Sequence, residues 1–374
     1  MRIAVITCHN VKNYGSVFQT YATQSYLERL GHQVYFIDYQ RKDTADYEIL
    51  DVRARQSQRI YRNRLLRILF KIILNFSIQK QIQVFNAFLH QYIHLTERSY
   101  YSNEELKEDC PSADLYVSGS DQIWNTKINH RIEYPYFLDF VPESAPCISI
   151  STSFGNTALS EEEKPILKLL LKKYWMISVR EKSGEAILEQ LGIHGAKALM
   201  DPTNLLGLDE WRQLEQPISH PELYILVYHL RPDKKFDQYV NNLCKEKNMK
   251  AVHILLYYHK AVVLRGIHKV MPKPGQVLSL IRDASYIVTD SFHMCSFAIK
   301  YHKPFVVMYP DNFGERIDNL LRITKLEQRH VIDEKDLEKI DAPIDYNAVD
   351  NRITEQVDRM KNWIEDALKN IRII

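Results

Sequence analysis

The sequence lacks several patterns that would assign its chemistry directly. It contains neither Gly-x-Gly-x-x-Gly nor Gly-x-x-x-x-Gly-Lys-Ser/Thr, which excludes a dinucleotide fingerprint and a P-loop. Its five cysteines are scattered and form no Cys-x-x-Cys pair, so neither a zinc cage nor a disulfide framework is supported. The formal net charge of +2 gives no sign of a nucleic-acid partner. We therefore expect no metal, no cofactor and no nucleic acid.

Long apolar runs are also missing. No stretch approaches the roughly eighteen uninterrupted apolar residues that suggest a membrane span. Residues 1–7 are expected to form a short buried strand, without the cleavage site of a secretory signal. The composition, 45% hydrophobic and 26% charged, is typical of a folded globular protein. We predict a reduced, cytoplasmic protein.

The first forty residues introduce the pattern of the whole chain. Arg2–Cys8 is an apolar strand, and Val17–Leu30 has apolar residues at the three- and four-residue spacing of a helix. Gly31 then ends the helix before a second predicted strand at His32–Tyr39. A strand, a helix and a strand in this order predict a parallel pair.

The same alternation predicts two α/β domains with mainly parallel sheets. The first covers residues 1–205 and is interrupted at about 41–108 by a helical insertion. A polar boundary separates it from a second domain at 222–345. A helix at 349–374 closes the chain and is a candidate to return to the N-terminal domain.

Ligands of open parallel sheets bind beyond the carboxyl ends of the strands, so the loops there are the candidate site. Asp290-Ser-Phe-His293 follows a predicted strand and precedes a helix. Asp290 or Ser291 can cap that helix, and its free N–H groups can meet an anion. His293 can exchange a proton near neutral pH. The alternative is a simple cap followed by a half-buried histidine without a catalytic role.

Three loops of the first domain follow the same logic. Arg180 ends a strand and offers a planar fork for carboxylate or phosphate, or else a salt bridge to Glu181 or another acid. Residues 118–121, Ser-Gly-Ser-Asp, can bind a phosphate or sugar hydroxyls, or form a turn against Trp124. Residues 13–16, Asn-Tyr-Gly-Ser, occupy the first strand-to-helix turn, where a plain tight turn is the alternative.

The insertion is strongly basic. No Asp or Glu occurs between Val52 and Thr96, and a helix is expected at about 59–88. Leu65, Leu69, Ile72 and Phe76 form an apolar stripe, so the segment at about 53–80 is a candidate for peripheral contact with the inner face of the membrane. The alternative is a helix packed on its own domain with a solvated basic edge. The basic residues are Arg53, Arg55, Arg59, Arg62, Arg64, Arg67, Lys71 and Lys80.

Eight short segments in order carry a family resemblance across nearly the whole chain. They are Asn13–Ser16 with Leu30-Gly31, Val117–Asn125, Ser151–Gly155, Ser178–Gly184, Asp201–Thr203, Val288–His293, Lys303–Phe305 and Arg316–Leu321. Together they resemble the polysaccharide pyruvyl transferase family.

The resemblance implies two Rossmann-like domains with parallel sheets, in a GT-B-like arrangement with an interdomain cleft. It also implies transfer of pyruvate from phosphoenolpyruvate onto two hydroxyls of a sugar or lipid-linked saccharide, with release of phosphate. The product would be a cyclic ketal of a surface polysaccharide. His293 and Arg180 match the donor-site residues. The family usually has glycine after the histidine, where this sequence has Met294, whose side chain can narrow the donor pocket or change the donor.

For this reaction we hypothesise that His293 is the general acid and that Asp121, or Asp290 if it is no cap, is the base. The predicted catalytic residues are His293, Arg180 and Asp121. The predicted donor-binding residues are Arg180, Ser291, Phe292, His293, Ser118, Gly119 and Ser120. The predicted acceptor-binding residues are Asn13, Tyr14, Gly15, Asp121 and Arg316.

Two other functions stay open. A sugar-nucleotide glycosyltransferase on the same architecture would need a nucleotide pocket marked by glycines and a ribose-binding glutamate, and residues 286–296 show neither. A non-catalytic carbohydrate-binding homologue would keep the fold and lose turnover, and Met294 is the feature that allows it.

Overall fold

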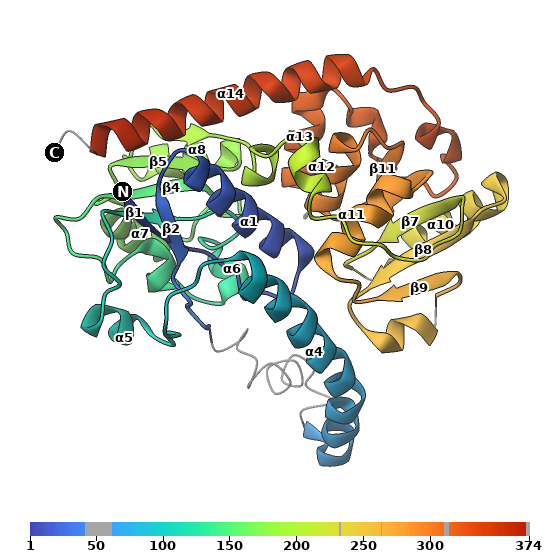
Figure 1. Cartoon of the computed structure of the whole chain (residues 1–374), viewed down its shortest axis with the longest axis horizontal. Helices are drawn as coiled ribbons and strands as arrows, with labels where there is room; N and C mark the ends of the chain where they lie inside the picture. The colour runs from blue at the N-terminus through green and yellow to red at the C-terminus, as the bar shows by residue number, and fades with distance from the viewer. Residues whose placement is uncertain (42–61, 232, 263, 310–313, 372–374) are drawn as a thin grey trace. The chain divides into compact units, whose positions relative to one another are not determined.

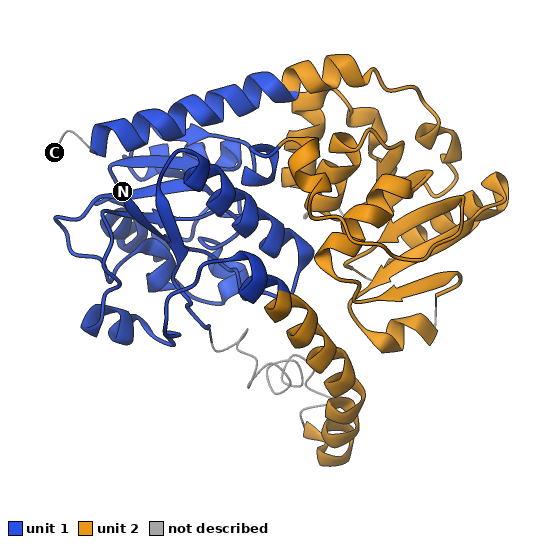
Figure 2. Ribbon diagram, in the orientation of Figure 1, with its two compact units in different colours: residues 1–45, 88–206, 353–374 blue, residues 46–87, 207–352 orange. Residues whose placement is uncertain are grey.

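The computed structural model describes residues 1–41, 62–231, 233–262, 264–309 and 314–371. The chain divides into two compact units, coloured blue and orange in Figure 2. Unit 1 comprises residues 1–45, 88–206 and 353–374, and unit 2 comprises residues 46–87 and 207–352. Each unit is built on its own parallel sheet, as the alternation of strands and helices predicts.

Unit 1 contains a six-stranded sheet in the order β2-β1-β3-β4-β5-β6, with parallel pairing throughout (Figure 1). Its central strands β3 and β4 are buried at every position, which is typical of parallel sheets, although β4 places Ser149, Ser151 and Thr152 in the interior. The strands are β1 (Arg2–Ile6), β2 (Gln33–Phe36), β3 (Leu115–Ser118), β4 (Cys147–Thr152), β5 (Met176–Val179) and β6 (Lys197–Ala198).

The helices of unit 1 begin and end at residues whose chemistry explains the boundary. Asn13 caps α1 (Tyr14–Arg29) by accepting a hydrogen bond from the Gly15 N–H at 2.8 Å, so the helix starts three residues before the apolar pattern does. Gly31 follows the helix with φ +83°, a left-handed conformation that favours glycine. The other helical segments are α5 (Asn103–Glu108), α6 (Thr126–Asn129), η1 (Tyr134–Phe137), α7 (Glu163–Leu171), α8 (Lys182–Gln190) and η2 (Pro202–Asn204).

Unit 2 contains a five-stranded parallel sheet in the order β11-β10-β7-β8-β9. The strands are β7 (Tyr224–Tyr228), β8 (Lys250–Leu255), β9 (Ile267–Val270), β10 (Tyr286–Thr289) and β11 (Phe305–Val307). The edge strand β9 is only half-buried and lacks the continuous apolar run of its neighbours, which explains why the sequence pattern did not predict it. The helical segments within unit 2 are α9 (Leu208–Arg212), α10 (Lys234–Lys247), η3 (Tyr258–Val262), α11 (Pro274–Asp283), α12 (Phe292–Lys300), α13 (Glu315–Thr324), η4 (Glu327–Arg329) and η5 (Leu337–Ile340).

Two long helices run from one unit into the other along the chain. The first is α4 (Arg64–Tyr92), in the insertion between β2 and β3, and the second is α14 (Tyr346–Ile371), whose residues from 353 onward belong to unit 1. Residues 59–61 of the helix expected at 59–88 lie outside the described residues. No helix in the described part of the chain is both long and apolar enough to cross a membrane.

The strand orders locate one switch point in each sheet, where the chain reverses the direction in which it adds strands. It lies between β1 and β3 in unit 1 and between β7 and β10 in unit 2. Loops that leave such neighbouring strands diverge, and ligands of open α/β sheets bind in the resulting crevice. The loops after β1 and β3, and those after β7 and β10, are therefore the places to look for a site.

Candidate functional site

Asp121 is the focus of the loops at the unit 1 switch point. It follows β3 with φ +82°, an uncommon conformation for a residue other than glycine and one that surrounding contacts must hold. Its Oδ1 accepts hydrogen bonds from Arg180 Nη2 at 3.3 Å and from the Gln122 N–H at 2.9 Å. Its Oδ2 accepts from Cys8 Sγ at 3.3 Å and from Ser16 Oγ at 3.2 Å. The carboxylate is thus held in one orientation while its side chain stays 14% exposed.

Arg180 binds three carboxylates at once. Besides Asp121, its Nη1 donates to Asp201 Oδ2 at 2.8 Å and its Nε donates to Glu181 Oε1 at 3.2 Å. The side chain is 3% exposed, and although burial opposes the charge, Glu181, Asp121 and Asp201 together raise the pKa of Arg180. The structure therefore shows the alternative expected for this residue, a salt bridge to neighbouring acids. Its predicted role as a donor ligand stays a prediction.

Ser118, Gly119 and Ser120 lie in the interior, and their predicted role in binding the donor stays a prediction. Ser118 Oγ donates to the Tyr136 carbonyl at 2.8 Å and Ser120 Oγ donates to the Ser151 carbonyl at 3.0 Å, and neither serine is exposed. A Cβ at Gly119 would lie 3.1 Å from the Thr7 side chain, a tight contact, so glycine suits the close approach of this loop to the end of β1.

The loop after β1 leads into α1, and three residues at this junction are predicted to bind the acceptor. Asn13 is half-buried and is the cap of α1, and Tyr14 and Gly15 are buried in its first turn. This arrangement matches the tight-turn alternative, and the acceptor-binding role of the three residues stays a prediction.

A polar cluster that sequence reasoning did not single out occupies the same end of the unit 1 sheet. His9 Nε2 lies 3.0 Å from Asp38 Oδ1, and Lys12 Nζ donates to Asn10 Oδ1 at 2.5 Å. Burial works against ionisation of Asp38, yet hydrogen bonds from His9 and Ser99 bring the pKa of this carboxyl below its usual range. The available signal was the run of polar residues directly after β1.

In unit 2, the turn from β10 into α12 places His293 at the switch point. Ser291 is the N-cap of α12, because its Oγ accepts from the Met294 N–H at 3.4 Å. Thr289 Oγ1 accepts from the Ser291 N–H at 3.0 Å and donates to the Tyr228 carbonyl at 2.6 Å, which joins the turn to β7. His293 stands in the first helical turn and is 9% exposed.

Asp290 is occupied by backbone groups across the switch point. Its Oδ1 accepts from the Leu230 N–H at 2.7 Å and its Oδ2 accepts from the Arg231 N–H at 3.0 Å. Burial raises the pKa of Asp290 despite these bonds. The carboxylate therefore ties the loop after β7 to the loop after β10, while Ser291 caps the helix.

Phe292 and Arg316 complete the surroundings of His293. The Phe292 ring meets the His293 ring edge to face at 5.1 Å, and the half-buried Arg316 places its guanidinium 5.8 Å from the Phe292 centroid. Arg316, predicted with the acceptor residues of the first domain, thus belongs with Phe292 and His293 in unit 2. Met294 is 4% exposed and packs into the interior.

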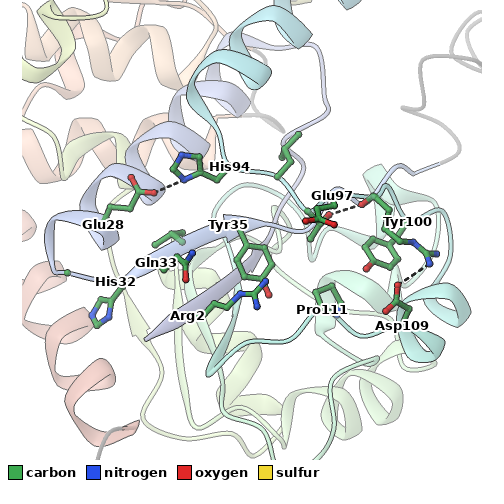
Figure 3. A pocket seen from close by; sticks show the side chains of 15 residues that line it. Arg2, Glu28, His32, Gln33, Tyr35, His94, Glu97, Tyr100, Asp109 and Pro111 are labelled. Atoms are coloured by element: carbon green, nitrogen blue, oxygen red, sulfur yellow. Dashed lines mark hydrogen bonds and ion pairs between the residues drawn. The ribbon is translucent and has the colours of Figure 1, made fainter.

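The hollow of about 940 Å³ shown in Figure 3 lies elsewhere in unit 1. It follows the edge strand β2, and its rim carries two ion pairs, His94 with Glu28 at 2.9 Å and Arg98 with Asp109 at 3.0 Å. None of the predicted site residues lines it. Among the residues that the structure describes, no three His, Cys, Asp or Glu side chains are grouped to hold a metal ion.

Similarity to solved structures defines the class of the fold. A putative UDP-N-acetylglucosamine 2-epimerase from Listeria monocytogenes superposes with a TM-score of 0.55 at 10% identity, covering 94% of this chain and 90% of that one. The UDP-N-acetylglucosamine 2-epimerase of Rickettsia bellii gives 0.55 at 12% identity, covering 100% and 98%. Anabaena Alr3699/HepE, solved with UDP and glucose, gives 0.50 at 8% identity, covering 99% and 100%. The protein is therefore a two-domain α/β protein with a Rossmann-like, GT-B-like fold.

A family model defines the chain more closely. The model for polysaccharide pyruvyl transferases matches residues 13–312, from the cap of α1 to the segment after β11. The chain belongs to the polysaccharide pyruvyl transferase family, as the eight ordered segments predict. No curated protein sequence matches it.

Proposed function

We propose that this protein transfers pyruvate from phosphoenolpyruvate to two hydroxyls of a sugar or lipid-linked saccharide, forming a cyclic ketal in surface polysaccharide biosynthesis. The observation that carries the proposal is the position of His293. In a chain that matches the family model, it stands at the unit 2 switch point in the first turn of a capped helix, beside Phe292, whose ring in turn contacts the Arg316 guanidinium.

The donor chemistry suits these groups. Phosphoenolpyruvate carries a carboxylate and a phosphate, and the Arg316 guanidinium and the N-terminal turn of α12 are groups that bind such anions. His293 in its protonated form would donate a proton to the methylene carbon, and the electron pair of the double bond would form the new C–H bond. The positive charge left at C2 is then attacked by a sugar hydroxyl oxygen.

Asp121 is the base in this proposal and accepts the proton of the attacking hydroxyl. Arg180 is proposed to position it, because the guanidinium holds one oxygen of the Asp121 carboxylate. A second hydroxyl then attacks C2 and its proton passes to the departing phosphate, while the C2–O bond to that phosphate breaks and its electron pair leaves with the phosphate oxygen. Asp121 then loses its proton to solvent, from which His293 regains one. Asp290, the other candidate base, is less suited because its side chain is only 2% exposed, against 14% for Asp121.

The test is His293→Ala. A general acid contributes roughly 10²–10⁴-fold to rate, so phosphate release in the presence of acceptor should fall by that factor. Binding of phosphoenolpyruvate, measured by calorimetry, should persist. Release of phosphate would be followed across a panel of sugar acceptors.

His194→Ala is the matched control. His194 has a side chain that is 74% exposed and pairs with Glu189 on the surface of unit 1, so its loss should leave phosphate release unchanged. Near-normal release by His293→Ala would remove this residue from the mechanism. Absence of release by the unaltered protein with every acceptor, with phosphoenolpyruvate bound but unconsumed, would identify a non-catalytic carbohydrate-binding protein instead.

A further inference from the structure

The first half of α4 presents an apolar face outward. Leu65 is 79% exposed and Phe76 is 70% exposed, and Leu69 and Ile72 between them are also exposed. Successive members of this set are three or four positions apart, so at about 3.6 residues per turn they share one side of the helix. From Leu74 onward the opposite side is buried in unit 2, where Leu74 and Ile78 form a small apolar cluster. The exposed side is therefore a second apolar face and not part of the core.

The contacts on the buried side fix the orientation of this face. Ser77 Oγ accepts from the Tyr258 N–H at 3.0 Å, and Gln81 Nε2 donates to the Leu256 carbonyl at 2.5 Å. Both bonds join α4 to the segment that follows β8. These two hydrogen bonds and the apolar cluster around Ile78 together anchor the helix on unit 2, which leaves the exposed leucine and phenylalanine side chains pointing away.

Positive charge borders the apolar face along both edges. On a helical projection Lys80 falls at one edge and Arg64 at the other. Arg62 lies just before the helix, and both arginines are exposed. The described part of the insertion, residues 62–96, contains no Asp or Glu. The nearest acids before it, Asp43, Asp46, Glu48 and Asp51, lie outside the described residues.

A hollow of about 990 Å³ extends the face toward η3. Its lining joins Ile73 and Phe76 of α4 with Tyr258 and Val262 of η3, and Lys80 stands beside them. Val262 is 86% exposed. An apolar hollow at the margin of an apolar face, with a cation at its rim, suits an acyl or isoprenoid chain beside an anionic headgroup.

We infer that this face, made by Leu65, Leu69, Ile72, Phe76 and Val262, docks on an anionic lipid surface. A symmetric pair of copies would bring the same basic edges close to one another, and the resulting repulsion disfavours self-association. Anionic headgroups instead neutralise both edges while the apolar side chains enter the boundary with the acyl chains.

The experiment is flotation of the full-length protein with vesicles. It should float with an equal mixture of phosphatidylcholine and phosphatidylglycerol, and much less with phosphatidylcholine alone or at high salt. Combined Leu69→Gln, Ile72→Gln and Phe76→Gln should abolish flotation. Arg62→Gln with Arg64→Gln should weaken it by about fivefold per charge at low salt.

A matched control variant replaces three exposed apolar residues outside α4 with glutamine. Combined Leu169→Gln, Leu223→Gln and Ile332→Gln alters three exposed apolar residues away from α4, at 72%, 60% and 68% exposure, and should float like the unaltered protein. Thermal unfolding checks that every variant is folded.

Three results would overturn the inference. The first is equal flotation with neutral and anionic vesicles, and the second is retained flotation of the α4 variant. The third is a stable dimer in sedimentation that is lost in the α4 variant, combined with no binding to vesicles. Because vesicle binding is read without turnover, these results are independent of the proposed reaction.

Discussion

Arg180 shows how one side chain can organise a strand-end site from within. Four strands deliver polar groups to the same edge of the unit 1 sheet, and three of the acids there converge on one guanidinium. A buried charge is tolerated only when paired, so the cluster holds together as a unit. Asp121 alone among the three acids is appreciably exposed, at 14% against 2% for Glu181 and 0% for Asp201. The arrangement therefore presents one oriented carboxylate to the outside.

Arg180→Met should be strongly destabilising. It removes the common partner of three carboxylates, two of them fully buried, and breaking a buried pair costs about 3–5 kcal/mol. We expect the free energy of unfolding in urea to fall by this amount. The comparison is Arg98→Met, since the Arg98–Asp109 pair has side chains 53% and 58% exposed and such surface pairs contribute at most about 1 kcal/mol. Equal losses in the two variants would contradict the organising role of Arg180.

At the scale of single elements, two buried histidines of unit 2 make the stability of the protein sensitive to acid. His253 lies within β8 and donates through Nε2 to the Arg265 carbonyl at 2.9 Å, and His229 directly follows β7 and stacks on Phe236 at 3.8 Å. Burial lowers the pKa of each imidazole to about 4. Both rings are therefore neutral in the folded protein at neutral pH, whereas in the unfolded chain they protonate near pH 6.5.

This difference makes stability fall as the solution is acidified. When the pKa of a histidine is lower in the folded protein than in the unfolded chain, acid protonates the unfolded chain first. The free energy of unfolding is therefore highest above the unfolded pKa and falls as the pH drops from about 6.5 toward 4. Each histidine should account for about 3 kcal/mol over that window. Urea unfolding at pH 7 and near pH 4.5 measures the total.

His253→Gln should reduce by one the number of protons that the protein takes up when it unfolds in acid. The glutamine amide can still donate a hydrogen bond but cannot titrate, so the unfolding free energy of the variant should vary less steeply with pH. His194→Gln, at an exposed position, should keep the slope of the unaltered protein. An unchanged slope in His253→Gln would show that this strand does not contribute.

At the scale of the whole molecule, the fold alone does not choose between donors. Its structural relatives include UDP-N-acetylglucosamine 2-epimerases and HepE in complex with UDP and glucose. The donor that we propose is an anion without a nucleotide.

Ligand-induced stabilisation separates the two donors. A ligand that binds only the folded protein stabilises it by about 2.7 kcal/mol at a concentration of 100 times its Kd. We expect the thermal unfolding midpoint to rise with phosphoenolpyruvate and to stay unchanged with UDP or UDP-sugars. A rise with UDP-sugars and none with phosphoenolpyruvate would favour the glycosyltransferase alternative.

The sequence by itself determined the two-domain α/β architecture, because most of its strands and helices, β9 excepted, follow from local patterns. Apolar runs bounded by polar loops specify the central strands, and capping residues specify the starts of the helices that follow. It also located Asp121 and His293 in loops at the carboxyl ends of two of these strands, β3 and β10, as the structure shows. The order of eight segments was enough to assign the family that the family model confirms.

Only the tertiary structure decided what each polar side chain does within those loops. Ser118 and Ser120 look identical to ligand-binding serines in sequence, yet carbonyl groups of distant segments take their hydroxyls. The sequence also gives no sign that Asp201 pairs with Arg180. The two residues meet because they follow β5 and β6, which are neighbours in the sheet. Hydrogen-bond partners that are far apart in the chain depend on how the strands are ordered in the sheet, and a local pattern carries no record of that order.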